Sequence, residues 1–223
     1  MADQRESSTA AVGEWTKSEL VRYVGGLSNP SKMPCMGYSL PAQECLTGSK
    51  LRDVPGTTCS VCYARKGRFR FGVVKNAMYR RLDSILNPLW VNVMAELIWR
   101  TGDGYFRWHD SGDLQSTDHL GRIVAVCLET PEVMHWLPTR EYQIVQNYII
   151  EGGEIPENLN IRVSAHMVDG PAPAIIGFTG SIVSSGEPPE GVHTCPAPLQ
   201  EGKCGDCRAC WDKDVDLVNY HAH

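Results

Sequence analysis

The sequence predicts an α/β fold built from parallel βα units. Three short apolar segments, at residues 104–108, 133–137 and 159–165, have the length and composition of strands. Between them, apolar residues recur with the period of a helix, so strands and helices alternate along the chain. Strands joined by helices of this length pair in parallel through right-handed crossovers, as in α/β sheets.

The helices are defined by their apolar period and by their end signals. One helix is expected over residues 74–86, and Pro88 then suits the first turn of a second helix. Ser116 is placed to cap a third helix. Thr139 is placed to cap a fourth, which ends at a pair of glycines.

The remaining segments divide the chain into three parts. Residues 28–60 contain four prolines and show no period, so they are expected to be irregular, and residues 174–184 are expected to add one or two strands. The length of 223 residues suits one compact domain with a small appended lobe. The predicted parts are an N-terminal tail and lead-in at 1–27, a βα body with a three-cysteine loop at 28–185, and a four-cysteine segment at 186–223.

The composition excludes several classes of protein. With 42% hydrophobic and 21% charged residues, the chain can bury a core and is not disordered as a whole. No apolar run approaches the ~20 residues of a membrane span, and the polar N-terminus lacks a secretory signal. The net charge of −5 argues against a basic coat over the whole surface. We therefore expect a soluble, cytoplasmic protein.

The nine cysteines are the most informative residues, because clustered thiols in a reducing compartment are more often metal ligands than disulfides. Cys204, Cys207 and Cys210 form a C-x2-C-x2-C run, and Cys195 lies nine positions upstream, followed by a proline. Three thiols at this spacing can surround one corner of an iron–sulfur cluster while a distant fourth closes it. The same four thiolates could hold a structural zinc ion, so both interpretations stay open.

A second cysteine group lies in the first half of the chain. Cys59 and Cys62 form a C-x2-C pair, Cys45 lies upstream, and Cys35 is a candidate fourth ligand. If only three of these thiols bind a four-iron cluster, one iron stays open to a small molecule. Cys127 differs, because it lies on the apolar face of its predicted helix and is expected to be a small buried hydrophobe.

Polar residues follow each of the three predicted strands. The loop 109–113 follows the first strand, Arg140 the second and Ser164 the third. Because functional residues of parallel sheets gather at the carboxyl ends of the strands, we expect a site at this edge. The candidates for catalysis are His109, Asp110 and Arg140. A turn or capping role is the alternative for the polar side chains of the loop.

A basic stretch directly follows the second cysteine group. Residues 65–81 contain seven Lys and Arg residues and no acidic residue, and Phe69, Phe71 and Tyr79 are interleaved with them. Such a stretch can bind nucleic acid or another phosphate-bearing partner through charge and stacking. A solvated helix face with a few buried aromatic residues is the alternative.

Four motifs combine into a specific pattern: SLPAQEC at 39–45, CSVCYARKG at 59–67, WHDSGD at 108–113, and the C-terminal run from Cys195 to Trp211. The combination resembles the gene product 88 family of cysteine-rich phage proteins, over most of the chain from residue 30 onward. The resemblance implies a phage-encoded protein of the host cell cytoplasm, and the family label carries no settled biochemistry. Cys35 lies outside the family pattern, which implies three N-terminal ligands.

The order of the parts is a cysteine group, helices, a strand leading to Ser111-Gly112-Asp113, and two further βα units. This order resembles, more distantly, radical S-adenosylmethionine enzymes, which implies a partial (β/α) barrel of parallel strands. It also implies that Asp113 replaces the glutamate that holds the amino group of the cofactor, and that the C-terminal cysteines bind an auxiliary cluster. The usual C-x3-C-x2-C spacing is absent. The expected cofactor-binding residues are Ser111, Gly112, Asp113 and Ser164, and the expected metal ligands are Cys45, Cys59, Cys62, Cys195, Cys204, Cys207 and Cys210.

Two functions follow from these expectations. In the first, an open [4Fe-4S] cluster binds S-adenosylmethionine and a reductant supplies an electron, so that radical chemistry acts on a substrate, with nucleotides and nucleic acid among the candidates. In the second, one or two iron–sulfur or zinc sites stabilise a non-catalytic protein that binds nucleic acid or a host partner. Neither function involves a membrane.

Overall fold

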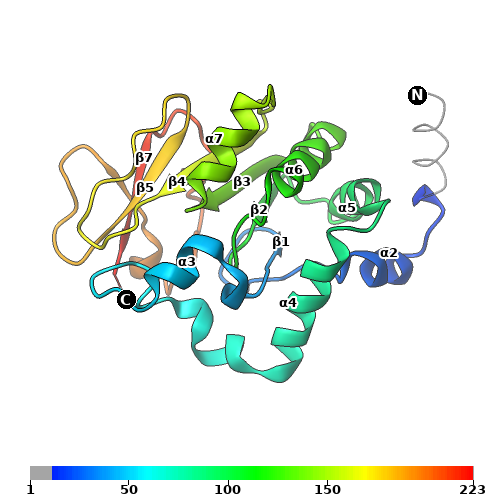
Figure 1. Cartoon of the computed structure of the whole chain (residues 1–223), viewed down its shortest axis with the longest axis horizontal. Helices are drawn as coiled ribbons and strands as arrows, with labels where there is room; N and C mark the ends of the chain where they lie inside the picture. Colours follow the sequence, from blue (N-terminus) through cyan, green and yellow to red (C-terminus); the bar gives the residue numbers. More distant parts are fainter. Residues whose placement is uncertain (1–11, 223) are drawn as a thin grey trace.

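The computed structural model describes residues 12–222, which form one seven-stranded sheet with helices packed against it (Figure 1). All strands are parallel, in the order β1-β2-β3-β4-β5-β7-β6. This confirms the expected α/β fold with a parallel sheet. Residues 1–11 of the expected tail and lead-in lie outside the described residues, and a helix occupies Lys17–Val24 in the remainder. No helix within 12–222 is long and apolar enough to cross a membrane.

The α-helices are α2 (Lys17–Val24), α3 (Leu46–Leu51), α4 (Gly72–Ser84), α5 (Trp90–Trp99), α6 (Thr117–Glu129) and α7 (Tyr142–Ile150). The strands are β1 (Gly37–Tyr38), β2 (Tyr105–Trp108), β3 (Met134–Thr139), β4 (Leu159–Ser164), β5 (Thr179–Ser184), β6 (His193–Thr194) and β7 (Leu217–His221). Short 3-10 turns are η1 (Ala42–Glu44), η2 (Tyr63–Arg65), η3 (Gly67–Arg70) and η4 (Ala197–Leu199).

The elements expected between residues 74 and 165 are all present. The predicted strands are β2, β3 and β4, and the predicted helices are α4, α5, α6 and α7. Ser116 caps α6 as expected, because its hydroxyl accepts a hydrogen bond from the His119 N–H at 3.1 Å. Thr139 does not cap α7, which begins after Glu141 without a side-chain cap. Its hydroxyl instead bonds to the buried carboxylate of Asp113.

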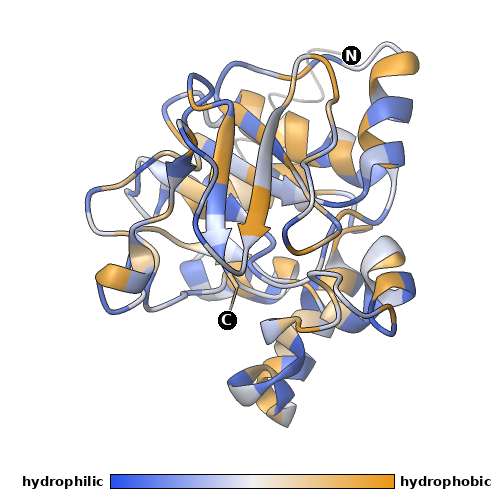
Figure 2. Ribbon diagram, turned by 90° about the vertical axis from the view of Figure 1, so that its left-hand side faces the viewer, coloured by the Kyte–Doolittle hydropathy of each residue, from blue (hydrophilic) through white to orange (hydrophobic). Residues whose placement is uncertain are grey.

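Three strands, β1, β6 and β7, were not expected from the sequence. The segment 28–60 contains β1, a two-residue strand paired with β2, besides η1 and α3. The C-terminal segment contains β7, which lies between β5 and β6. Figure 2 shows β5 and β7 side by side with their arrows pointing the same way. The C-terminal cysteine segment therefore contributes to the same sheet as the βα units.

The two faces of the sheet carry different contents, because strand residues alternate between faces. Phe106, Trp108 and Leu137 belong to the large apolar core that the sheet forms with the helices. The opposite face carries a smaller cluster in which Trp136 packs against Cys35 and Trp211. The segment that bears the C-terminal cysteines therefore packs on the face opposite the main core.

Candidate functional site

The segment between β1 and α4 carries Cys45, Cys59 and Cys62 and lies across the carboxyl ends of the strands (Figure 1). The Thr47 backbone N–H and hydroxyl donate to the buried carboxylate of Glu141, at 2.8 and 2.7 Å. Further along, the Thr58 N–H donates to the carbonyl oxygen that follows β4, at 2.8 Å. These bonds join the cysteine segment to the ends of β3 and β4.

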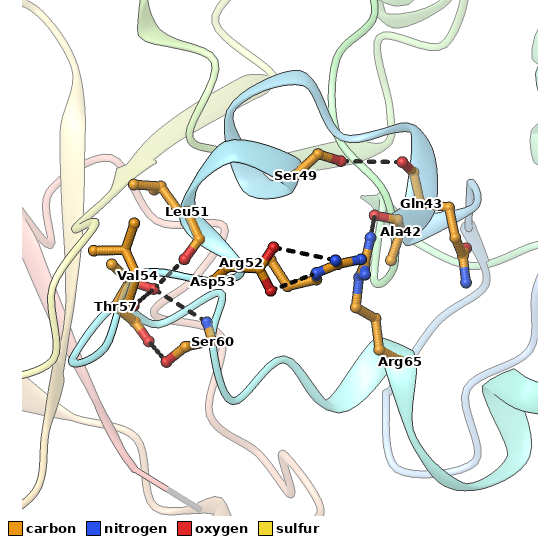
Figure 3. Close-up of polar contacts among 10 residues, drawn as sticks. All are labelled: Ala42, Gln43, Ser49, Leu51, Arg52, Asp53, Val54, Thr57, Ser60 and Arg65. Atoms are coloured by element: carbon orange, nitrogen blue, oxygen red, sulfur yellow. Dashed lines mark hydrogen bonds and ion pairs between the residues drawn. The ribbon is translucent and has the colours of Figure 1, made fainter.

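Hydrogen bonds within the segment give it a defined path although no sheet ladder passes through it (Figure 3). The Thr57 hydroxyl bonds to the carbonyls of Leu51 and Val54, at 2.7 and 2.9 Å. Ser60 donates to Thr57 from its N–H and from its hydroxyl, at 3.1 and 2.7 Å. Thr57 therefore closes the turn that leads into Cys59.

The structure brings the three N-terminal thiols into one neighbourhood, as free cysteines. Cys45 precedes α3, and a Cβ atom built on Gly48 would lie 3.5 Å from the Cys59 sulfur and 3.7 Å from the Cys45 sulfur. The two sulfurs are thus no farther apart than the sum of those distances. Cys62 is close enough that its charge adds to the rise in the pKa of both other thiols, after the larger effect of burial.

The environment of these thiols opposes a free thiolate. Burial raises the pKa of Cys45 most, and the carboxylate of Asp113 raises it further. Burial also raises the pKa of Cys59, although the nearby Arg140 guanidinium acts in the opposite direction. Protonated, half-buried thiols are poor nucleophiles at neutral pH. A thiol releases its proton when its sulfur binds a metal. Metal ligation therefore suits Cys45 and Cys59 better than nucleophilic catalysis.

The thiols are near one another without surrounding a single point. Among residues 12–222, no group of three His, Cys, Asp or Glu side chains is arranged to hold one metal ion. In a tetrahedral zinc site with bonds of about 2.3 Å, the sulfurs lie about 3.8 Å apart. The described side chains do not form such a site in either cysteine group.

Asp113 joins the loop after β2 to the end of β3. Its buried carboxylate accepts hydrogen bonds from the Leu114 N–H at 2.8 Å, the Thr139 hydroxyl at 2.5 Å and the Arg140 N–H at 2.9 Å. Burial nevertheless raises its pKa to about 6. The carboxylate lies close enough to Cys45 and Cys59 to raise their pKa values, so it borders the thiol group as expected.

Asp110 joins three segments at the carboxyl ends of the strands, an edge of the sheet called here the rim. Its carboxylate accepts a hydrogen bond from the Ser39 hydroxyl, and its carbonyl accepts one from the Tyr63 hydroxyl. Ser111 follows, with a buried hydroxyl that has no partner among the described residues. Its carbonyl accepts the Leu40 N–H at 2.7 Å. The polar loop therefore links β1, β2 and the turn after Cys62.

His109 does not reach the rim. Its backbone is left-handed, with φ of 58°, and its side chain is buried in the core, where the ring lies beside His119 with centroids 5.2 Å apart. The Nδ1 atom lies 2.9 Å from the Tyr38 carbonyl oxygen. Burial lowers the pKa of His109 to about 4. A neutral, enclosed imidazole packs the core, and the position does not favour the catalytic role expected for it.

Gly112 serves the chain itself. Its φ is 83°, and an added Cβ atom would lie 2.5 Å from the Cβ of Leu40 and 2.9 Å from the Leu40 backbone. The glycine lets the loop pass directly over Leu40, the second residue after β1. The expected approach of this glycine to a ligand is therefore replaced by an approach to Leu40.

Arg140 and Ser164 both lie at the rim. The Arg140 Nε donates to the carbonyl of Ala165 at 3.3 Å, and its charge acts on Cys59 and Tyr142. The Ser164 hydroxyl accepts a hydrogen bond from Ser181 at 3.0 Å, and its carbonyl accepts the Tyr142 hydroxyl. Both residues therefore lie at the same end of the sheet as the thiols.

Two neighbours of the thiols escaped the sequence analysis. Glu141 is buried and anchors α3 through Thr47, and Tyr142 stacks on His166 with ring centroids 4.7 Å apart. The His166 Nε2 atom is buried and has no partner among the described residues. An acid followed by an aromatic residue at a strand end is too common a pattern to identify either residue in advance.

The C-terminal thiols form a second neighbourhood. Charge on Cys195 and Cys207 raises the pKa of Cys204, after the larger effect of burial. The Cys207 sulfur lies 3.4 Å from His193 Nε2. Cys210 lies deeper, where its sulfur is 3.1 Å from the Tyr220 hydroxyl and burial raises its pKa to about 11. Cys195, Cys204, Cys207 and Cys210 are therefore neighbours on the second face of the sheet.

Cys35 and Cys127 stand apart from the N-terminal group. Cys35 packs against Trp136 and Trp211, and the thiol whose charge acts on it is Cys204. Its candidate place as a fourth N-terminal ligand is therefore not supported by its position. Cys127 is fully buried in the main core, as expected.

Comparison with known proteins gives one match. No curated protein and no solved structure matches the chain. None of the comparisons supports the distant resemblance to radical S-adenosylmethionine enzymes. The family model of gene product 88 matches residues 4–213, a span that includes all nine cysteines and the rim loop. The chain therefore belongs to the gene product 88 family.

Proposed function

We propose that this chain is an iron–sulfur protein in which Cys45, Cys59 and Cys62 hold a [4Fe-4S] cluster with one open iron. We further propose that the sheet is a partial (β/α) barrel and that the open iron binds S-adenosylmethionine. When bound and reduced, this pair of groups supplies a carbon radical that abstracts hydrogen from a substrate. The substrate remains to be identified.

The observation that carries the proposal is the position of the three free thiols. They lie together at the carboxyl ends of an all-parallel sheet, in the segment that directly follows the edge strand β1. Ligand sites of parallel sheets occur at this end of the strands. The order of neighbouring strands from β1 to β5 also follows the chain, as in a barrel that has not closed.

The residues present fit a cluster better than a single zinc ion. No single-ion group forms among residues 12–222, although the thiols are neighbours. Each thiolate of a four-iron cluster binds a different iron, so its sulfurs lie farther apart than the sulfurs around one zinc ion. The proposal therefore assigns iron and sulfide to this site in preference to zinc.

The chain supplies groups that can hold a small polar cofactor beside the cluster. The Ser111 hydroxyl and His166 Nε2 are buried without partners, and such atoms in a native structure often face a ligand or water. Among residues 12–222, the Asp113 Oδ2 atom accepts one hydrogen bond, from the Arg140 N–H, so it has capacity for the amino group of the cofactor. The Arg140 charge offsets that of the thiolates.

The C-terminal thiols are proposed to bind a second, auxiliary cluster. Their mutual electrostatic effects place Cys195, Cys204, Cys207 and Cys210 in one neighbourhood. With four thiol ligands this cluster would have no open iron, so its role would be structural or electron transfer. The alternative for the whole chain is a non-catalytic metal-stabilised binding protein.

The proposal is tested on protein purified and reconstituted without oxygen. Iron and sulfide are assayed, electron paramagnetic resonance spectra are recorded before and after S-adenosylmethionine is added, and 5′-deoxyadenosine is measured after a low-potential reductant is added. We expect about eight irons per chain, a spectral change with the cofactor, and 5′-deoxyadenosine. Cys62→Ser should lose about half of the iron and all of the product.

Cys127→Ala is the matched control, because it removes a buried thiol of the core and should keep both iron and turnover. Zinc without sulfide would defeat the cluster assignment. Full iron with no cofactor-dependent spectral change and no 5′-deoxyadenosine would defeat the enzyme assignment and leave an electron carrier or a structural site.

A further inference from the structure

The residues that follow the N-terminal thiols project from the body of the protein. Residues 63–80, called here the basic arm, comprise η2, η3 and most of α4. Figures 1 and 2 show this region extending below the sheet, and Figure 2 shows polar and apolar positions mixed along it. Met78 is the anchor of the arm in the core, and most of the other side chains are partly or fully exposed.

The cations of the arm are largely free of internal partners. Among residues 12–222, five of their side chains have neither an ion pair nor a hydrogen bond: Lys66, Arg68, Arg70, Lys75 and Arg80. Arg81, the next residue, differs because it is buried and donates to the carbonyls of Gly26 and Leu27. In the basic stretch, Arg81 therefore supports the fold, whereas the five unpaired cations form an exposed surface.

The positive charge of the arm is local and opposite in sign to the net charge of the whole chain. The chain carries a net charge of −5, whereas residues 54–82 contain no acidic residue. The carboxylate that contacts the arm is that of Glu44, which accepts the Tyr79 hydroxyl at 2.9 Å. A local concentration of unpaired cations attracts anionic partners even when the protein as a whole is acidic.

Aromatic side chains lie exposed among the cations. Tyr63 is 52% exposed, Phe71 is 59% exposed and Tyr79 is 37% exposed. Phe69 packs edge-on against Tyr63, with ring centroids 5.8 Å apart. Interleaved cations and exposed rings can bind phosphates and stack bases.

We propose that the basic arm binds single-stranded nucleic acid, with its arginines on the backbone phosphates and Phe71 and Tyr79 against the bases. Three of the five free cations are arginines, whose planar donors match phosphate oxygens, and guanidinium groups also stack on bases. An acidic protein would use the charge but leave the arrangement of rings unexplained, and a phosphate-rich membrane surface is separated from a nucleic acid by the vesicle measurement of the test. Aromatic rings stack on bases that are unpaired, so the exposed rings favour a single strand over a duplex.

The inference does not depend on the cluster, since the arm consists of this chain's own side chains. It does give the proposed function a substrate class, because Tyr63 directly follows the ligand Cys62 and its hydroxyl reaches the rim at Asp110. A strand bound along the arm would lie beside the N-terminal thiols.

The test is fluorescence anisotropy of a labelled oligothymidylate with the full-length protein, in a series of salt concentrations, with and without bound iron. We expect the wild-type protein to bind with a salt-dependent affinity. Arg68→Gln with Arg70→Gln should weaken binding and lower the slope of log K against log salt by about 1.4, because two phosphate contacts are lost. Phe71→Ala should weaken binding about tenfold and leave the slope unchanged.

The matched control is Lys203→Gln with Lys213→Gln, which removes the same charge from side chains paired with Glu201 and Glu157 and should bind as the wild type does. The proposal is overturned if that control weakens binding equally, or if duplex DNA, polyglutamate or phosphatidylserine vesicles bind as well as the oligonucleotide. Binding without 5′-deoxyadenosine production would separate this inference from the proposed enzyme.

Discussion

Gly48 shows how a single residue controls the geometry of the candidate site. In an ordinary helix, replacing glycine by alanine stabilises the protein by up to about 1 kcal/mol. In α3, however, the new Cβ atom would lie 3.0 Å from the Cβ of Cys45 and in contact with both sulfurs. The space that a methyl group would fill is the space between two proposed ligands.

We therefore expect Gly48→Ala to lower the iron content of the reconstituted protein and to give no gain in the free energy of unfolding. The control is Gly121→Ala in α6, where the added Cβ atom meets only a ring carbon of Tyr148 at 3.5 Å. That variant should keep its iron and gain up to about 1 kcal/mol. Iron assays and urea unfolding measure both effects, and equal iron in the two variants would show that Gly48 has no role in ligation.

At the residue scale, the sequence located the site but not the direction of each side chain. Asp113 and Arg140 lie beside the thiols, as their positions after β2 and β3 predicted. His109 directly follows β2, as Arg140 directly follows β3, yet the left-handed backbone of His109 turns its ring into the core. A single sequence does not reveal whether a non-glycine residue has a positive φ, so the inward direction of the His109 side chain could not be predicted.

Among the elements, β4 does more than extend the sheet, because Arg162 connects it to the C-terminal cysteine segment. Its buried guanidinium donates to the carbonyls of Gly180, Ala209 and Asp212, at 2.8, 2.9 and 3.1 Å. Asn160, on the same face of β4, donates to the carbonyl of Asp212 at 3.1 Å. These bonds replace the regular structure that the segment lacks.

Arg162→Met should therefore lower the free energy of unfolding by about 2–4 kcal/mol, because several buried carbonyls lose their donors. The loss should be local, so limited proteolysis should cleave within 186–212 before it cleaves the βα units. Lys203→Met, an exposed control in the same segment, should change the unfolding free energy by less than about 0.5 kcal/mol. Uniform cleavage of the whole chain in the Arg162 variant would show that the arginine supports the entire fold instead.

The strands that escaped prediction, β1, β6 and β7, share one property, which is that distant partners define them. The strand β1 has two residues, too few for any alternation, and it exists because β2 offers an edge. The strand β7 forms between β5 and β6 after a segment rich in proline, glycine and cysteine. Helices α4 to α7 carry their own apolar periods, and α6 also has its capping residue, so local sequence was sufficient for them.

Over the whole molecule, the sheet separates a large apolar core on its helix side from the cysteine-bearing segments on its other side. The helix side holds a continuous apolar core in which three histidines are buried, His109, His119 and His135. The opposite face and the carboxyl ends hold the cysteines other than Cys127, and several polar contacts between distant segments. Stability thus resides mainly in the βα units, while the proposed chemistry occupies the segments added to them.

This separation gives the folded protein a defined sensitivity to acid. Burial lowers the pKa of His109 to about 4 and that of His135 to about 3, and it lowers the pKa of His119 as well. In the unfolded chain, histidines titrate near 6.5, so between pH 6.5 and 4 the unfolded state binds more protons and stability falls as pH falls. Asp113 acts in the opposite sense. Its pKa is about 6 in the folded protein and 3.8 in the unfolded chain, so between these pH values the folded state binds the extra proton.

Three histidines against one carboxyl leave a net difference of about two protons near pH 5, which corresponds to a loss of about 3 kcal/mol per pH unit. We expect urea unfolding of metal-free, reduced protein to show this slope between pH 6 and 4.5. His119→Gln should reduce the slope by about one third to one half, because it removes one of the buried titrating rings and leaves two against Asp113. His221→Gln, on the partly exposed end of β7, should leave it unchanged. A free energy of unfolding that stays constant over this range would mean that the histidines are protonated inside the core, with partners that the fold as described does not give them.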